Sequence, residues 1–295
     1  MYRYFTERQN EGDVPYTDLA VERRRADLNV EGVEYKREIG LFGVWERIKI
    51  TSDEGAKSIG RPIGIYDTLR TSRMDLIDEE SVEDAKDEIA RELCYLCDLE
   101  DLFPEKVLVV GLGNGRLAPD SVGTESAHKI KPTMHIKKFD EDFFNSLDCS
   151  EIAIITPGVS SDTGYDSYVS VAGLCDRIKP DVIVAIDSLA SRSTDRLGTT
   201  IQISNTGILP GSGIGNVNYA LDKKSLGVPV ISIGVPTIID SHLFSEKKTT
   251  GNKLTDLLSD NYSGMFVSPR EINDIVDSAS DIIAGGINQA FGLFF

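Results

Sequence analysis

Cysteine and histidine are scarce in this sequence, which has four cysteines and three histidines among its 295 residues. Cys94 and Cys97 form a C-x-x-C pair, but no second pair accompanies it, so the usual pattern of a four-cysteine zinc site is missing. The segment around them has helical periodicity, and we expect both side chains to lie in the core. Because no secretory signal is visible, disulfides are not expected either.

Short motifs of several enzyme classes are also missing. The sequence contains no H-E-x-x-H, no G-x-S-x-G and no phosphate-binding loop of the form G-x-x-x-x-G-K-S/T. Ser188, Ser191 and Ser193 lie close to Asp187 in the chain, yet no histidine stands in the context of a catalytic triad. The glycine-rich stretches do not fit G-x-G-x-x-G, so we expect no bound cofactor.

Long apolar runs and basic clusters are absent as well. No run of about 18 apolar residues occurs, which predicts no membrane-spanning helix. Residues 1–13 lack the apolar segment of a secretory signal, so we expect a cytoplasmic protein. The net charge is −17 and lysine and arginine are scattered, which argues against direct nucleic-acid binding. Such a charge would attract a basic partner protein.

Four apolar runs, each leading into a loop, dominate the second part of the chain: residues 106–114, 151–158, 181–190 and 228–236. Continuous apolar runs are typical of buried parallel strands, and helix-like segments separate these four. The pattern predicts an α/β fold around a mostly parallel sheet. A smaller antiparallel element is expected within residues 29–67, where apolar and polar residues alternate.

Two helices have recognisable ends. Residues 75–99 predict an acidic helix, with aspartate and glutamate concentrated in its first half, where they favour the positive end of the helix dipole. At the other end of the chain, Ser268, Pro269 and Glu271 have the spacing of an N-terminal cap, and we expect the last helix to begin there.

Two aspartates follow or end different predicted strands. In open α/β sheets the site lies beyond the carboxyl ends of the strands, where Asp120 and Asp187 are expected. Two neighbouring carboxyls cannot both ionise cheaply, so one keeps a proton and the pair can act as acid and base on a water molecule. A metal held by both aspartates and His128 is an alternative. So is a structural role, because a strand-end aspartate often caps a helix.

The glycine-dense turn at residues 210–216 offers a further element of a site. Gly211, Ser212 and Gly213 could direct backbone N–H groups toward an oxyanion or a peptide substrate. The simpler interpretation is a turn that needs positive φ angles or close backbone contact.

Several stretches in order along the chain resemble the germination protease family of spore-forming bacteria. They are "VVGLGN" with "PDSVG", "AIDSLASRS", "TIQISNTGI", "LGVPVISIGVPTIID" and "VSPREI". The resemblance implies a three-layer α/β/α sandwich related to hydrogenase-maturation endopeptidases. It also implies an atypical aspartic endopeptidase, with Asp120 and Asp187 at the family's catalytic positions. It further implies a homotetramer of the spore core that degrades small acid-soluble spore proteins during germination.

The same resemblance implies a zymogen that processes itself. In "YTDLAVER" the order hydroxyl, acid, aliphatic and small residue copies the family's cleavage pattern, which predicts a cut between Asp18 and Leu19. Residues 1–18 would then be a propeptide arm and residues 19–295 a single peptidase domain. Arg192 and Arg196 are candidates for holding the acidic residue before the cut, because guanidinium groups bind carboxylates in pairs of hydrogen bonds. Pairing with local acids is the equal alternative.

Two other functions stay open from the sequence. A metal-dependent endopeptidase could use the same two carboxylates. A non-catalytic acidic protein of this charge could bind basic spore proteins without cutting them.

Overall fold

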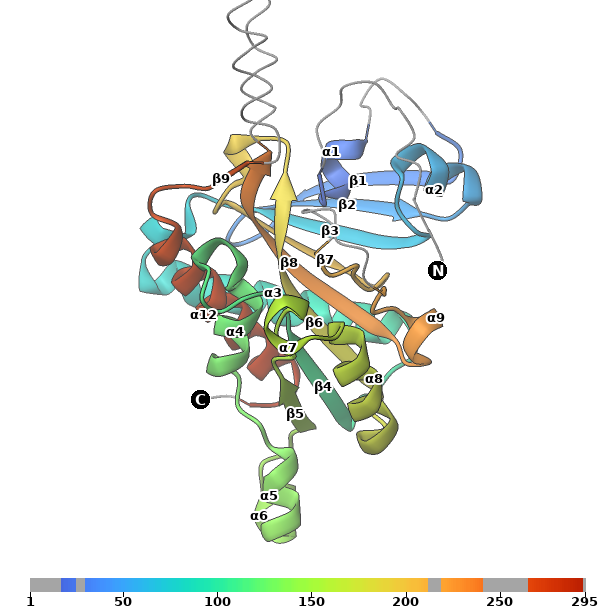
Figure 1. Ribbon diagram of the computed structural model, residues 1–295, viewed down its shortest axis with the longest axis vertical. Coiled ribbons are helices and arrows are strands. Elements are labelled where there is room, and N and C mark those ends of the chain that lie inside the picture. Colours follow the sequence, from blue (N-terminus) through green and yellow to red (C-terminus); the bar gives the residue numbers. More distant parts are fainter. Residues whose placement is uncertain (1–16, 25–29, 212–218, 241–264, 294–295) are drawn as a thin grey trace, which may run out of the picture.

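The computed structural model describes residues 17–24, 30–211, 219–240 and 265–293, and the strands of this part form one sheet of nine (Figure 1). The strand order is β1-β2-β3-β7-β8-β6-β4-β5, and β9 pairs with β8. Helices cover both faces of the sheet, which confirms the predicted α/β fold class.

The parallel half of the sheet contains the four strands expected from the apolar runs. Within each strand, alternate residues are buried in different clusters: Val107 and Val109 belong to the main core, whereas Leu108 and Val110 face the second cluster. This two-sided burial explains why the strands have continuous apolar sequences. The strands are β4 (Lys106–Gly111), β5 (Glu151–Ile155), β6 (Val182–Ser191) and β8 (Val230–Asp240).

The remaining strands are antiparallel, so the sheet is more mixed than expected, with five antiparallel and three parallel pairings. Residues 192–199 connect β6 to β7 and are too short for a parallel crossover, which needs a dozen or more residues. The N-terminal strands join the same sheet through the β3–β7 pair. These strands are β1 (Val33–Ile39), β2 (Val44–Ile50), β3 (Gly64–Arg70), β7 (Thr200–Ser204) and β9 (Phe266–Val267).

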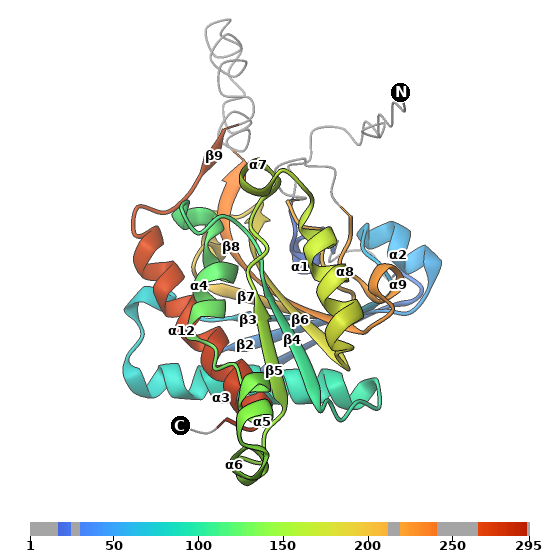
Figure 2. The same cartoon turned by 60° about the horizontal axis from the view of Figure 1, so that its bottom comes forward.

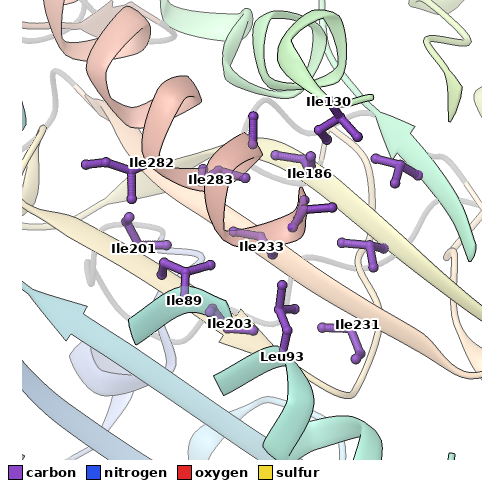
Figure 3. Packing of buried hydrophobic residues seen from close by; sticks show 14 of the residues in the cluster. Ile89, Leu93, Ile130, Ile186, Ile201, Ile203, Ile231, Ile233, Ile282 and Ile283 are labelled. Carbon is purple, nitrogen blue, oxygen red and sulfur yellow. The ribbon is translucent and has the colours of Figure 1, made fainter. Parts of the chain in front are cut away.

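Three helices pack on one face of the sheet and enclose the main core. Figure 3 shows Ile89 and Leu93 from α3 meeting Ile282 and Ile283 from α12 over the sheet residue Ile233. Figure 2 shows α4 and α12 on one side of the parallel strands and α8 on the other. The helices of the first face are α3 (Glu79–Leu99), α4 (Val122–Lys129) and α12 (Ile272–Ala290).

The opposite face has shorter helices and two smaller clusters. Helix α8 covers the parallel half through Val171 and Cys175. Helices α1 and α2 cover the antiparallel half, where Ala20 packs with Ile59. The helices outside the first face are α1 (Ala20–Arg23), α2 (Asp53–Ile59), α5 (Met134–Phe139), α6 (Glu141–Ser146), α7 (Ser160–Thr163), α8 (Ser167–Ile178) and α9 (Lys223–Leu226).

Two local predictions are wrong. The last helix begins at Ile272, after Glu271 and with no side-chain cap, so Ser268 does not cap it; Ser268 directly follows β9, which pairs with β8. Cys97 is buried in the core as predicted, but Cys94, three residues earlier on α3, is exposed. The predicted acidic helix is confirmed, with Asp78 accepting a hydrogen bond from the Ser81 N–H at its start.

A buried ionic cluster joins α3 to the antiparallel strands. Arg47 Nε lies 2.6 Å from Asp67 Oδ1, and its Nη2 lies 3.0 Å from Glu92 Oε1. Burial raises the pKa of Glu92, and the neighbouring Asp67 raises it further. Asp67 Oδ2 has no hydrogen-bond donor among the described residues when both acids are ionised. A proton on Glu92 supplies that donor, so we infer that the pair keeps one proton in the folded state.

The Glu92→Gln variant tests this cluster. Above the ordinary glutamate pKa of about 4.3, the folded chain retains a proton that the unfolded chain has lost, so the free energy of unfolding falls as pH rises. Glutamine copies the protonated acid, and its unfolding free energy should therefore fall less steeply, by up to about 1.4 kcal/mol per pH unit. Urea denaturation between pH 5 and 8 measures this slope. Glu83→Gln, on an exposed side chain of the same helix, is the control, and equal slopes in all three proteins would contradict the shared proton.

Candidate active site

Asp120 reaches the site through a loop that turns back after β4. Gly113 in this loop has a φ of +93°, and a Cβ added there would lie 2.1 Å from the carbonyl oxygen of Asp120. Asp120 ends a short 3₁₀ turn, Ala118–Asp120, just before α4. Its Oδ2 accepts a hydrogen bond of 2.9 Å from the Asn114 N–H. The loop glycine and this bond together fix the carboxylate at the carboxyl edge of the sheet.

A bulge in β8 holds the same turn from the other side. The pairing of β6 with β8 shifts between Leu189 and Ala190, which leaves Thr237 as the extra residue of β8. The Thr237 hydroxyl donates a hydrogen bond of 2.6 Å to the Pro119 carbonyl, next to Asp120. Bulges commonly redirect a side chain in this way beside a site.

Asp187 lies within β6, one residue beyond the point where its neighbour β4 ends. The last pair of these two strands is Gly111 with Ile186. Asp187 is 6% exposed, and its Oδ1 accepts a hydrogen bond of 2.9 Å from the Ser188 N–H. The strand therefore presents this carboxyl at the edge where Asp120 arrives.

Both aspartates line one cavity of about 560 Å³. Burial raises the pKa of Asp187 well above its ordinary value, and the charge of Asp120 raises it further. Burial also raises the pKa of Asp120, although the Asn114 N–H opposes this shift. The structure thus brings together the two side chains that the sequence predicted, in surroundings that favour one shared proton.

The segment from Thr17 to Glu22 lies against the end of β6, beside this cavity. Asp18 lines the cavity, and its charge contributes to the raised pKa of Asp187. The Asp18 N–H donates to the Ala190 carbonyl at 2.9 Å, and Asp18 Oδ2 accepts from the Ala190 N–H at 2.9 Å. Leu19 is fully buried. The bond predicted to be cut is therefore close to the predicted catalytic residues. The rest of the predicted arm, residues 1–16, lies outside the described residues.

The two predicted substrate arginines have local partners. Arg196 Nη2 lies 3.1 Å from Glu46 Oε2. The Arg192 backbone N–H donates to Glu22 Oε2 at 2.7 Å, and its guanidinium donates to the Glu22 carbonyl at 3.3 Å. Neither arginine is among the described residues that line the cavity. Their predicted role is not tested by this arrangement, but the local pairing considered as its alternative is present.

The glycine-rich turn is only partly described. Gly211 lines the cavity and has a φ of +69°, which suits glycine. Ser212 and Gly213 lie outside the described residues, so their predicted role stays a prediction.

Sequence reasoning missed two polar side chains of the cavity, Arg61 and Gln202. Arg61 follows α2, and Gln202 lies within β7 among apolar neighbours. The only signal for Gln202 was a polar residue inside the apolar run "TIQIS". Nothing in the sequence around Arg61 distinguishes it from other arginines.

His128 lies away from the two aspartates as an exposed residue near the end of α4, and it does not line the cavity. Within the described ranges, no three histidine, cysteine, aspartate or glutamate side chains are grouped so that they could hold a metal ion.

Comparison with known proteins identifies the family of the chain. A family model described as germination protease matches residues 15–249. The chain belongs to the germination protease family. A germination protease of Clostridium perfringens is 35% identical, with 93% of this chain and 94% of the relative aligned. One from Caldanaerobacter subterraneus is also 35% identical, over 93% of both chains.

Membership of the germination protease family makes the chain a peptidase. Among solved structures, the NiFe hydrogenase maturation protease HycI from Thermococcus kodakarensis matches with 18% identity and a TM-score of 0.34, covering 63% of this chain and 96% of that one. Of the helices that the structure describes, none has the length and apolar content needed to cross a bilayer.

The variants Gly113→Ala and Gly164→Ala test how Asp120 is placed. Both glycines have positive φ angles, but a Cβ at Gly164 would meet nothing within 4 Å, whereas one at Gly113 would collide with the Asp120 carbonyl. We expect Gly113→Ala to lower the unfolding free energy by about 1–3 kcal/mol more than Gly164→Ala, and to lower peptidase activity as well. Urea denaturation and a peptide-cleavage assay measure the two effects. Equal behaviour of the variants would show that this loop does not position Asp120.

Proposed function

We propose that this chain is an atypical aspartic endopeptidase that degrades small acid-soluble spore proteins during germination. Residues 1–18 act as a propeptide, and residues 19–295 form the peptidase domain. By the family resemblance, it works in the spore core as a homotetramer. The observation that carries the proposal is that Asp120, Asp187 and the predicted cleavage site at Asp18 all meet at one cavity.

The two aspartates divide the acid and base roles between them. Asp187 is the more deeply buried and has the negative charge of Asp120 beside it, so it holds the shared proton. Asp120 and Asp187 each accept one backbone N–H, from Asn114 and from Ser188, so the deeper burial of Asp187 decides which carboxyl keeps the proton. Two carboxyls whose surroundings separate their pKa values in this way can serve as a general acid and a general base.

The reaction then follows from these protonation states. The ionised Asp120 accepts a proton from a water molecule, whose oxygen attacks the carbonyl carbon of the scissile peptide bond. Asp187 donates its proton to the carbonyl oxygen as the tetrahedral intermediate forms. When the C–N bond breaks, the proton held by Asp120 goes to the leaving amine, and Asp187 recovers its proton from the hydroxyl of the intermediate. The cycle leaves a carboxylic acid and an amine.

Self-processing is supported by the way the segment around the cut is held. Glu22, four residues after Asp18, accepts two hydrogen bonds through its carboxylate. The donors are Ser191 Oγ at 2.8 Å and the Ser193 N–H at 3.1 Å. Ala20 is fully buried against the antiparallel strands. Together with the hydrogen bonds between Asp18 and Ala190, these contacts hold the segment on both sides of the bond that we propose is cut.

The variants Asp120→Asn and Asp187→Asn test the paired-carboxylate mechanism. Each removes either the base or the acid, so each should slow cleavage of a small acid-soluble spore protein by about 10²–10⁴-fold or more, with little change in thermal stability. Mass spectrometry of the digest measures the cleavage rate. Asp176→Asn, on an exposed side chain of α8, is the matched control and should cut at the wild-type rate.

Three outcomes would contradict this proposal. Full activity in either site variant would show that the pair is not the acid and base. Loss of wild-type activity with a chelator, restored by one metal ion, would favour a metal-dependent peptidase. Intact substrate that co-elutes with the wild-type protein would instead indicate a binding protein.

A further inference from the structure

The segment that carries the predicted cut lies in a groove whose contacts go beyond those of an ordinary surface loop. Gln202 spans the scissile bond: its Nε2 donates to the Asp18 carbonyl at 3.3 Å, and its Oε1 accepts from the Ala20 N–H at 2.8 Å. The Ala190 carbonyl accepts from the Asp18 N–H. Because these three contacts involve only backbone groups of the segment, any extended peptide could make them.

Other contacts depend on the side chains of the segment. The Asp18 carboxylate accepts from the Ala190 N–H at 2.9 Å through Oδ2 and lies 3.5 Å from Arg61 Nη2 through Oδ1. Arg61 Nη2 also donates to the Thr17 carbonyl at 3.0 Å. An acidic side chain at this position therefore has one partner for each carboxylate oxygen: the Arg61 guanidinium for Oδ1 and the Ala190 N–H for Oδ2.

A second side-chain preference follows two residues later. Ala20 is fully buried in a cluster with Ile48, Ile50, Ile59 and Tyr66. A larger side chain at this position would have to displace packed aliphatic groups of β2 and α2, which costs free energy. The groove thus matches an acid and a small residue separated by one apolar residue.

We propose that this groove is the subsite for substrates in trans, and that Arg61, together with the Ala190 N–H, selects the acidic residue before the cleaved bond. The inference rests on the proposed function, because it takes Asp18–Leu19 as the bond that is cut. It assigns acid selection to Arg61 instead of Arg192 and Arg196, whose guanidinium groups face Glu22 and Glu46.

The buried Nε atom of Arg61 supports this role. Its Nε is buried and has no hydrogen-bond partner among the described residues. A buried donor without a partner is costly. The Asp18 carboxylate contacts Nη2 and leaves Nε without a hydrogen bond, so a substrate carboxylate that reaches both nitrogens gains one bond more. Guanidinium groups bind carboxylates through two adjacent N–H groups, so Nε and Nη2 offer such a pair.

Use of this groove by substrates requires a rearrangement. After the proposed cut, Leu19–Arg24 remains attached to the chain, and in the structure Leu19 and Ala20 occupy the positions that follow the cut bond. A substrate that uses the whole groove has to displace them. Self-cleavage avoids this competition, since the segment is already bound, and it therefore tests the subsite most simply.

A double-mutant cycle on the full chain tests the pairing of Arg61 with Asp18. We expect Arg61→Gln and Asp18→Asn each to slow self-cleavage by roughly ten- to hundredfold, because each removes a charge-assisted hydrogen bond. The double variant should be no more than a fewfold slower than either single variant, since the interaction is already lost. Intact mass, followed over time at mildly acid pH, gives the rates.

Controls separate a specific role from a loss of folding. Arg61→Lys keeps the charge and should recover part of the rate. Arg91→Gln, on an exposed side chain of α3, should process like the wild type. Thermal melting of each variant shows whether it is folded. General damage to the fold by Arg61→Gln would slow self-cleavage by the same factor with and without Asp18→Asn, and would not produce coupling.

The outcomes distinguish a failure of the Arg61 assignment from a failure of the proposed function. If the wild type is processed but the losses from Arg61→Gln and Asp18→Asn multiply in the double variant, Arg61 does not select the acid, although the proposed function stands. The same holds if Arg61→Gln has no effect. If the wild type stays as intact as Asp187→Asn, self-processing fails and the subsite assignment fails with it.

Discussion

Two carboxyl groups that have lost most of their water in one cavity cannot both carry a negative charge at neutral pH without a large cost in free energy. Asp120 and Asp187 are in this situation, and the structure around them maintains it. Strand β4 ends opposite Ile186, one residue before Asp187 in β6, and the Leu112 N–H continues their pairing with a bond of 2.8 Å to the Ile186 carbonyl. The loop at Gly113 and the bulge in β8 then fix Asp120. One proton shared between an unequal pair is the result, and the proposed mechanism uses this proton for acid–base catalysis.

The parallel and antiparallel halves of the sheet contribute different residues to the site. The parallel half brings the two aspartates to one edge, as parallel strands commonly do. The antiparallel half contacts the segment with the predicted cut: Gln202 lies on β7, and Ile48 and Tyr66 on β2 and β3 pack around Ala20. Because β8 pairs with both β6 and β7, the strands that carry Asp187 and Gln202 lie on either side of it. A third carboxylate, that of Asp18, can enter this cavity because Arg61 and a backbone N–H face it.

The sequence predicted those parts of the fold and of the site that depend on local sequence patterns. Continuous apolar runs indicated the four parallel strands, and the position of Asp120 and Asp187 at strand ends indicated the pair. It did not predict that β9 would pair with β8, because this pairing joins distant segments. Gln202 and Arg61 were missed for the same reason: each becomes part of the cavity only when β7 and the residues after α2 meet the end of β6. The choice of antiparallel direction for β7 was readable in principle from the short connection before it.

Titration of the two aspartates tests the shared proton most directly. Carbon-13 labelling of aspartate carboxyls, in a chain kept whole by Asp18→Ala, would report each ionisation by NMR, and loss of a signal in Asp187→Asn would assign it. The account predicts that Asp187 titrates well above the ordinary aspartate pKa of about 3.9. In Asp120→Asn its pKa should fall, because a neighbouring charge is gone, but should stay above the ordinary value, because burial remains. An Asp187 that ionises at the ordinary pKa, or whose titration does not move in Asp120→Asn, would contradict the account.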